Sequence, residues 1–340
     1  MASGTYILGG LAGMLIAYLD EQAIDLPPLR ATLSKRTPAE QVPIESWWEW
    51  LEAIQRAHSR PALGIHIGRH IQPHHIGVLG YLLLSCDNGS QVLDSFQRFQ
   101  PLLHNLNPSS ATINGPRLRI AWDYSYGTST QLSNEVLLSS FLTNIRTFVG
   151  NTGIKFLRIT FPGAVPQYSD LYEELLECPV EFSAKSLSLE LETAWLLEKI
   201  PTADPHLRDV LVKQAESLME TTPRPDPFIK SLEFEILQAV PDGDISAATI
   251  AQTLGIPLRS FYRRLDQRGV NFRLLLQSIR YQLAKQYLSD NNIKLTEISS
   301  LLGYSEQSAF GRAFKQWHGT TPNRYRDLIK AEGLKYQNKI

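Results

Sequence analysis

The last third of the chain has apolar residues at helical spacing, and it predicts helix after helix without a strand-like run. A short pattern occurs there twice, in Ile250–Ile256 (IAQTLGI) and, 48 positions later, in Ile298–Tyr304 (ISSLLGY). Each copy predicts a short helix that ends at a glycine, because glycine adopts the positive φ of a tight turn without steric cost. A further helix follows each glycine, so the two copies predict two helix-turn-helix units.

The helices that follow the two glycines, 258–265 and 306–317, are each expected to have one apolar and one polar face. The apolar stripe of the first helix is expected to consist of Leu258, Phe261 and Leu265. The stripe of the second is expected to consist of Phe310, Ala313, Phe314 and Trp317. Any surface helix turns polar residues outward, but two copies that each follow a glycine turn favour a pair of recognition helices.

The polar faces of these helices carry residue types that recognise DNA. Arginine can form two hydrogen bonds to guanine, and early outward residues of a recognition helix reach base edges. The residues expected to read bases are Arg259, Tyr262, Arg263, Gln307, Ser308 and Arg312. Arg264 and Lys315 are expected to contact phosphate, which carries no sequence information.

An apolar-periodic stretch at 272–288 joins the two units and predicts a helix of four to five turns. Such a helix would hold the units at a fixed separation. Two recognition helices can enter successive major grooves on one face of double-stranded DNA when they lie about 34 Å apart. We therefore expect an all-α C-terminal domain with two helix-turn-helix units joined by a linker helix.

The first two thirds of the chain mix helical and strand-like patterns and predict an α+β domain. Helical patterns surround 47–57, 76–85 and 91–103, and the apolar run at 6–19 is expected to be the opening helix. Strand-like runs occupy 117–124, 155–161 and 180–191. The tripeptide Asn114-Gly115-Pro116 predicts a turn before the first of these runs.

A proline-rich segment divides the chain. Three prolines occur within the seven residues 221–227, and proline blocks helix continuation and restricts the residue before it. We expect the α+β domain at 1–222, a linker at 223–228, the double helix-turn-helix domain at 229–330 and a C-terminal tail at 331–340.

The net charge of −1 hides an asymmetry between the two parts. Residues 229–340 contain 16 Lys and Arg against 10 Asp and Glu, a net charge of +6, so the remaining residues carry −7. A basic module beside an acidic body suggests a polyanion partner for the module alone. An architectural DNA-binding protein with little sequence preference is an alternative, but it should be more basic throughout than this chain.

The cysteines and the absence of targeting signals indicate a cytoplasmic protein. Cys86 and Cys178 lie 92 positions apart and fit no metal-binding or redox spacing, so reduced thiols are expected. No segment reaches the length of a membrane span, and no basic residue precedes the run at 6–19 as it would in a signal peptide.

No enzyme signature occurs in the sequence, so we expect no catalytic residue and no cofactor. The alternative from another class is an enzyme with a DNA-binding appendage, such as a repair alkyltransferase. That chemistry needs an activated thiol. Cys178 has no adjacent basic residue that would activate it.

Four histidines raise the possibility of a metal site. His66, His70 and His74 are spaced four residues apart with His75 beside the last, and two histidines four apart on a helix can share a metal. Pro73 interrupts that helix, and no cysteine or carboxylate cluster joins it. Histidines on a helix surface or a pocket wall are therefore the favoured interpretation, and no metal is expected.

Three tryptophans could instead stack a ligand. From Trp47, however, the helical spacing includes Trp50, Leu51 and Ile54, which favours core packing. Trp48 does not fit this spacing and is expected to be exposed or to face a pocket.

The second predicted unit resembles the AraC/XylS family of transcription regulators. The resemblance rests on 303–322 (GYSEQSAFGRAFKQWHGTTP) and on Tyr325-Arg326, and 280–288 (RYQLAKQYL) resembles the linker helix of the family. The family usually places a serine before two of its helices, where this chain has Pro257 and Lys294. Proline suits a helix start, whereas lysine is a poor cap at the positive end of the helix dipole. The resemblance implies a sequence-specific regulator that activates transcription through contact with RNA polymerase.

The N-terminal part resembles the subgroup with an arabinose-binding-type N-terminal domain. The matching pieces are 63–68 (LGIHIG), 77–81 (GVLGY) and 178–182 (CPVEF). In this subgroup the first domain is thought to sense a small molecule and to mediate dimerisation. The resemblance therefore implies that residues 1–222 bind a small-molecule effector and form a homodimer, without implying that the effector is a sugar.

Overall fold

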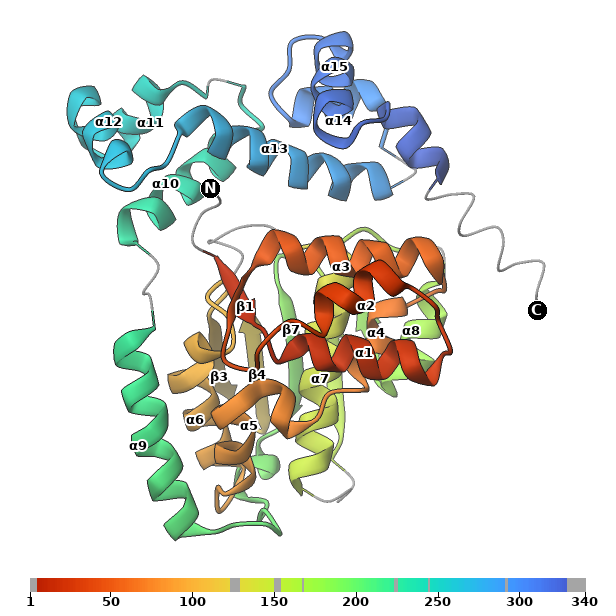
Figure 1. The fold of residues 1–340 in the computed structure, drawn as a ribbon, viewed down its shortest axis with the longest axis vertical. Coiled ribbons are helices and arrows are strands. Elements are labelled where there is room, and N and C mark those ends of the chain that lie inside the picture. The colour runs from red at the N-terminus through yellow and green to blue at the C-terminus, as the bar shows by residue number, and fades with distance from the viewer. Residues whose placement is uncertain are drawn as a thin grey trace. The chain divides into compact units, whose positions relative to one another are not determined.

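The computed structural model describes residues 5–122, 129–149, 154–166, 168–222, 226–243, 245–290 and 293–328. The chain forms two compact units (Figure 1). One unit consists of Thr5–Asp123 and Gln131–Arg224, and the other is built mainly from Pro225–Ile340. Within the described part of the chain, no helix is both long enough and apolar enough to cross a membrane.

The N-terminal unit combines a mixed sheet with helices. Its five-stranded sheet has the order β3-β4-β7-β5-β6, in which β5 and β6 are parallel and the other pairs are antiparallel. The strands are β3 (Ser109–Asn114), β4 (Arg117–Trp122), β5 (Phe156–Thr160), β6 (Val180–Glu181) and β7 (Leu187–Glu192). A separate two-stranded sheet pairs β1 (Tyr6–Leu8) with β2 (Gln41–Pro43). The predicted α+β class is confirmed.

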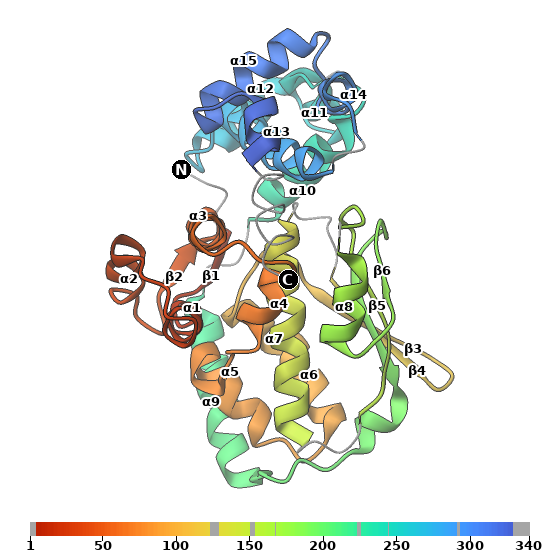
Figure 2. The same cartoon turned by 90° about the vertical axis from the view of Figure 1, so that its right-hand side faces the viewer.

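The α-helices of this unit pack around one face of the larger sheet (Figure 2). They are α1 (Leu11–Glu21), α2 (Pro27–Leu33), α3 (Ile44–Ala57), α4 (Leu63–Gly68), α5 (Gly77–Leu84), α6 (Gly89–Phe99), α7 (Gln131–Val149), α8 (Ser169–Leu176) and α9 (Pro205–Thr221). The ring of Trp122 on β4 contacts Phe141 of α7 edge-on, at a centroid distance of 5.2 Å. The opposite face of the sheet is polar, with Glu190 accepting a 2.7 Å hydrogen bond from Arg158.

Two features of the N-terminal unit differ from the sequence prediction. The apolar run at 6–19 forms strand β1 first, and helix α1 begins only at Leu11, because Tyr6–Leu8 pairs with β2. The run at 180–191 is two strands rather than one, because Ser183 takes a positive φ of 57° and its N–H donates to the Gly163 carbonyl. The turn predicted at 114–116 joins β3 to β4.

The three tryptophans of α3 all lie in the core of the N-terminal unit. Trp47, Trp48 and Trp50 are 4%, 6% and 6% exposed, and all belong to one apolar cluster. The core-packing interpretation of Trp47 and Trp50 is therefore confirmed, and the expectation that Trp48 is exposed or faces a pocket is wrong. The apolar environment extends around α3, because α1, α2 and α4 all contribute residues to the same cluster.

A carboxyl group is buried where α7 packs against α4. One oxygen of Glu135 accepts a hydrogen bond from the Gly64 N–H at 3.0 Å, and the other accepts from the Tyr172 hydroxyl at 2.6 Å. Glycine is needed at position 64, because a Cβ there would lie 2.4 Å from the Leu132 carbonyl oxygen. Burial raises the pKa of Glu135 to about 7, although its hydrogen bonds act in the opposite direction.

We expect the buried Glu135 to make the N-terminal unit less stable as pH rises. Its folded pKa lies above the ordinary value of 4.5, so the folded unit holds an extra proton between pH 4.5 and about 7. The free energy of unfolding should therefore fall with rising pH across that window. Glu135→Gln should remove this fall and raise stability at pH 8 by on the order of 1 kcal/mol. Calorimetric melting of both proteins from pH 4.5 to 8 measures the difference, and a pH-independent difference would contradict the assignment.

The C-terminal unit is all helical, as predicted. Its helices are α10 (Pro227–Ala239), α11 (Ala247–Thr253), α12 (Leu258–Asp266), α13 (Phe272–Ser289), α14 (Leu295–Leu301) and α15 (Gln307–His318), and residues 322–328 are also helical. One apolar cluster includes buried residues from all six of the named helices. The two helix-turn-helix units therefore share a core and do not form two separate ones.

The predicted linker at 223–228 is partly helix. Residues 223–225 lie outside the described residues, and α10 begins at Pro227. Asp226 caps this helix, because its carboxylate accepts hydrogen bonds from the N–H groups of Phe228 and Ile229. Arg268 also donates to Asp226 at 2.6 Å. Partial burial alone would raise the pKa of Asp226. The hydrogen bonds from Arg268, Ile229 and Phe228 and the charge of Arg268 outweigh this effect and lower the pKa. The predicted tail at 331–340 lies outside the described residues.

Candidate DNA-binding surface

The two predicted glycine turns have the same backbone hydrogen bonds. In the first unit the Gly255 N–H donates to the Gln252 carbonyl at 2.9 Å, and the Ile256 N–H donates to Ala251 at 3.0 Å. In the second unit the residues 48 positions later make both bonds, at 2.9 Å each. The φ angles of Gly255 and Gly303 are 67° and 70°. The sequence repeat is thus a structural repeat, which confirms the two predicted turns.

The recognition helices expose the polar faces that the sequence predicts. Phe261 and Leu265 of α12 are buried, as are Phe310 and Phe314 of α15. The expectation for Leu258 is wrong, since its side chain is 42% exposed. Leu258 is the first residue of α12, where no preceding helical turn covers it.

The linker helix α13 holds the two units at its two ends. Helices α11 and α12 lie near one end of α13, and α14 and α15 lie near the other (Figure 1). Its 18 residues span about 27 Å at a rise of 1.5 Å per residue. The helix predicted at 272–288 is therefore present, one residue longer than expected.

Two arginines connect parts of the second unit through hydrogen bonds to backbone carbonyls. Arg280 of α13 donates to the Gly303 carbonyl at 3.2 Å, and its guanidinium lies 4.7 Å from the centre of the Tyr304 ring. Arg326 donates to the carbonyls of Leu288 and Ile293, at 3.4 and 2.8 Å. Both arginines belong to the sequence motifs quoted above, but the motifs alone did not reveal this connecting role. Both arginines are only partly exposed. Arg280 connects α13 to the second turn, and Arg326 connects the end of the unit to Leu288 of α13 and to Ile293 before α14.

Exposed cations without a protein partner gather on α12 and α15. Arg259 and Arg263 of α12, and Arg312 and Lys315 of α15, are exposed. Among the described residues, none of these four side chains has a carboxylate or hydrogen-bond acceptor in reach. Arg263 and Arg312 each lie two residues after a buried phenylalanine, Phe261 and Phe310, so they occupy equivalent places on α12 and α15. Unpaired cations on an exposed helix face are suited to a polyanion.

The other predicted contact residues are also exposed, but some have partners within the protein. Tyr262 is 48% exposed, and Gln307 is exposed as well. The Ser308 hydroxyl donates to the Glu306 carboxylate at 2.9 Å. The guanidinium of Arg264 lies 5.5 Å from the centre of the Phe228 ring.

The two helix starts that depart from the family pattern have no side-chain cap. Pro257 and Lys294 occupy the N-cap positions of α12 and α14, and neither side chain accepts a hydrogen bond from the backbone. In α11, by contrast, the Ser246 side chain accepts from the Thr249 N–H. The helices α12 and α14 therefore depend on the shared core for their stability.

The cysteine that an alkyltransferase would need is not activated. Cys178 is 4% exposed, and burial raises its pKa to about 11, with Glu173 as a second cause. A reactive thiol needs a lowered pKa and access to solvent. Cys178 has the opposite properties.

Both parts of the chain match known protein families. Residues 24–200, just over half of the chain, match the family described as the arabinose-binding domain of AraC transcription regulators, and residues 250–327 match a helix-turn-helix domain family. The structure of the transcriptional regulator CdpR from Pseudomonas aeruginosa aligns with 92% of this chain, over 96% of the CdpR chain. The sequence identity is 22% and the TM-score is 0.46.

The similar curated proteins are named as regulators. The ornithine utilization regulator of Pseudomonas aeruginosa is 26% identical over 269 residues, 78% of this chain and 79% of its own. The regulator VqsM of the same organism is 23% identical over 319 residues, 91% of this chain and 94% of its own. Together with the two helix-turn-helix units, these matches show that this chain is a DNA-binding transcription regulator that belongs to the AraC family.

Proposed function

We propose that the protein is a homodimeric activator that reads two successive major grooves with α12 and α15 and responds to a small-molecule effector. The observation that carries the proposal is the equivalence of Arg263 and Arg312. Both are exposed and unpaired within the described residues, and both lie two residues after a buried phenylalanine behind a glycine turn. One shared core holds the two helices, so a single DNA molecule can engage both.

The positions of the side chains predict which of them contact bases and which contact phosphate. Arg259, Tyr262 and Arg263 on α12 would read the edges of bases in one groove. Gln307, Ser308 and Arg312 on α15 would read the next groove, with the Ser308 hydroxyl exchanging its Glu306 partner for DNA. Arg264 and Lys315 would contact phosphate and set the register without reading sequence.

The N-terminal unit supplies the proposed control. It has its own core and its own sheet, and it contains more residues than the DNA-binding unit, so it is more than a tether. An effector that binds one state of this unit better than another would shift the dimer between DNA-bound arrangements. Dimers commonly read paired half-sites, which is the arrangement expected here. Contact with RNA polymerase would complete an activator.

Genome-wide mapping of bound sites tests this function. The full chain should enrich a small set of shared sequences, and a double variant, Arg263→Ala with Arg312→Ala, should lose that enrichment although it still binds DNA weakly. Transcription with purified RNA polymerase from a mapped promoter should then increase when the protein is added. Reduced transcription would contradict the activator role, and a strictly monomeric chain in sedimentation would contradict the dimer. Binding without any shared sequence would contradict the function itself.

A further inference from the structure

A polar pocket of about 500 Å³ lies in the N-terminal unit, between α1, α4 and the short helix η1 (Pro73–Ile76). Pockets of this size hold small metabolites. The lining includes four histidines and two arginines, and Glu21 is its one carboxylate. Its residues are Ala17, Tyr18, Glu21, Gln22, Arg60, His66, Arg69, His70, Gln72, His74 and His75.

The cationic charge of Arg60 is not neutralised by the protein. Arg60 is only partly exposed, and no carboxylate or hydrogen-bond acceptor is in reach of its side chain among the described residues. Burial lowers the pKa of the neighbouring His66 to about 4, and the charges of Arg60 and Arg69 contribute to this shift. An arginine that is half withdrawn from water without a partner is a natural anchor for an anion.

Glu21 does not compensate for this charge, because it is already paired. One of its oxygens lies 2.7 Å from Nε2 of His70. Nδ1 of the same ring lies 3.0 Å from the His66 carbonyl oxygen. Both ring nitrogens therefore face acceptors, and Glu21 is engaged with His70. Among the described residues, Arg60 is therefore the cation of this pocket that no carboxylate reaches.

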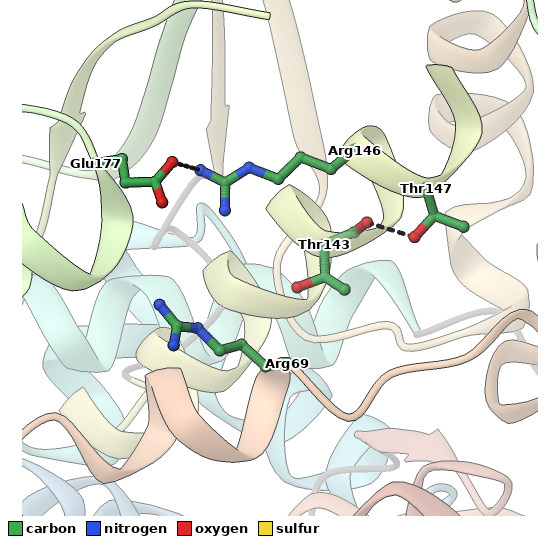
Figure 3. Close-up of a pocket in the computed structure, with 5 residues that line it drawn as sticks. All are labelled: Arg69, Thr143, Arg146, Thr147 and Glu177. Atoms are coloured by element: carbon green, nitrogen blue, oxygen red, sulfur yellow. Dashed lines mark hydrogen bonds and ion pairs between the residues drawn. The ribbon is translucent and has the colours of Figure 1, made fainter. Parts of the chain in front are cut away.

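In a neighbouring pocket of about 480 Å³, both arginines have hydrogen-bond partners within the protein (Figure 3). There the guanidinium of Arg146 donates to the Glu177 carboxylate at 3.0 Å, and the Thr147 hydroxyl donates to the Thr143 carbonyl at 2.8 Å. Arg69, which lines both pockets, donates to the Leu175 carbonyl at 2.6 Å. Of these two pockets, only the one around Arg60 contains an arginine without a partner among its described residues. It is therefore the better candidate for an anion-binding site.

The histidines of the pocket do not form a metal centre. Nδ1 of His75 accepts a hydrogen bond from the Gln72 N–H at 3.0 Å, and its Nε2 lies only 3.1 Å from where a side chain at Gly13 would begin. Both nitrogens of His70 are engaged as described above. Over the part of the chain that the structure describes, no three His, Cys, Asp or Glu side chains are placed to hold a metal ion. A cation would also be repelled by Arg60.

We infer that this pocket binds a small anionic effector through a carboxylate or phosphate group held by the Arg60 guanidinium, with the exposed side chains of Gln72 and His74 at its rim. The inference rests on the proposed effector control and names its site and ligand class. The bound anion would connect α1 to the segment 60–75, which contains α4 and most of η1 and lies far from α1 in the sequence. The histidines stand out in the sequence by their spacing, whereas no sequence pattern marks Arg60, because only the fold places it beside α1.

Isothermal titration of the full chain with inorganic phosphate and, separately, with succinate tests the inference at constant ionic strength. We expect saturable binding of at least one probe, and Arg60→Gln should weaken it at least about tenfold. Arg56→Gln is the matched control, since Arg56 is an exposed arginine at the end of α3 that does not line the pocket. It should bind like the original protein. A response to one probe alone identifies phosphate or carboxylate as the preferred group.

Gln72→Glu provides a second variant if Arg60→Gln fails to fold. Gln72 is exposed, and the His75 N–H donates to its backbone carbonyl at 2.9 Å, a hydrogen bond that the substitution leaves in place. The added negative charge should weaken anion binding as well. The inference is overturned if neither probe binds saturably, if Arg56→Gln weakens binding as much as Arg60→Gln, or if nickel alone binds and phosphate and succinate do not. The same proteins are assayed for DNA binding, so failure of the pocket with DNA binding intact leaves the proposed function standing.

Discussion

Arg312→Ala is expected to weaken binding to the operator by about ten- to a hundredfold and binding to random DNA far less. A bidentate contact between arginine and guanine gives roughly 1–3 kcal/mol of discrimination. Arg312 is exposed on α15 without a protein partner among the described residues, so its removal costs the folded protein little. The operator is a sequence obtained from the genomic mapping, and fluorescence anisotropy against operator and scrambled duplexes measures both affinities.

Lys315→Ala is the matched control for Arg312→Ala. Lys315 is exposed one turn further along the same helix, where a contact with phosphate is expected. Its removal should weaken operator and random DNA about equally and reduce the salt dependence by about one unit of slope. If Arg312→Ala weakens both duplexes by the same factor, Arg312 is a phosphate contact, and the assignment of base reading to α15 is wrong. If neither variant changes binding, α15 does not lie on DNA.

The double helix-turn-helix could be predicted from the sequence because its determinants are local. A glycine at the end of a short apolar helix specifies the turn, and the spacing of Phe310 and Phe314 specifies the buried face. Both signals lie within a few residues of the structure they determine. The backbone hydrogen bonds around Gly255 and Gly303 join residues of each turn and of the helix before it.

The features that could not be predicted depend on residues far away in sequence. Tyr6–Leu8 is apolar whether it forms a strand or a helix, and only its pairing with Gln41–Pro43 decides for the strand. Trp48 has no place in the apolar stripe from Trp47, but the N-terminal unit packs against more than one side of α3 and buries it. The pocket around Arg60 likewise forms only where residues 17–22 meet residues 60–75.

The two turn glycines illustrate the same limit. In sequence they are equivalent, and their φ angles differ by only a few degrees. Their surroundings differ. A Cβ at Gly255 would meet nothing within 4 Å, whereas a Cβ at Gly303 would lie 2.8 Å from the Val240 carbonyl oxygen and 3.0 Å from Cα of Gly243. Gly303 therefore lets the second unit pack against the end of α10, and no local signal distinguishes it from Gly255.

This difference predicts unequal effects of one substitution made at both positions. Gly255→Ala should cost only the strain of a left-handed residue, about 1 kcal/mol of unfolding free energy. Gly303→Ala should cost this strain and, in addition, the displacement of backbone atoms that no side-chain rotation can relieve, for a total of about 3 kcal/mol. Denaturant unfolding of the full chain, followed by amide hydrogen exchange of the C-terminal helices, measures both free energies. The difference also has a functional consequence, because a displaced second turn moves α15 relative to α12. Gly303→Ala should therefore reduce operator affinity more than Gly255→Ala does under conditions where both proteins are fully folded. Equal losses of stability would mean that Gly303 does not pack against α10.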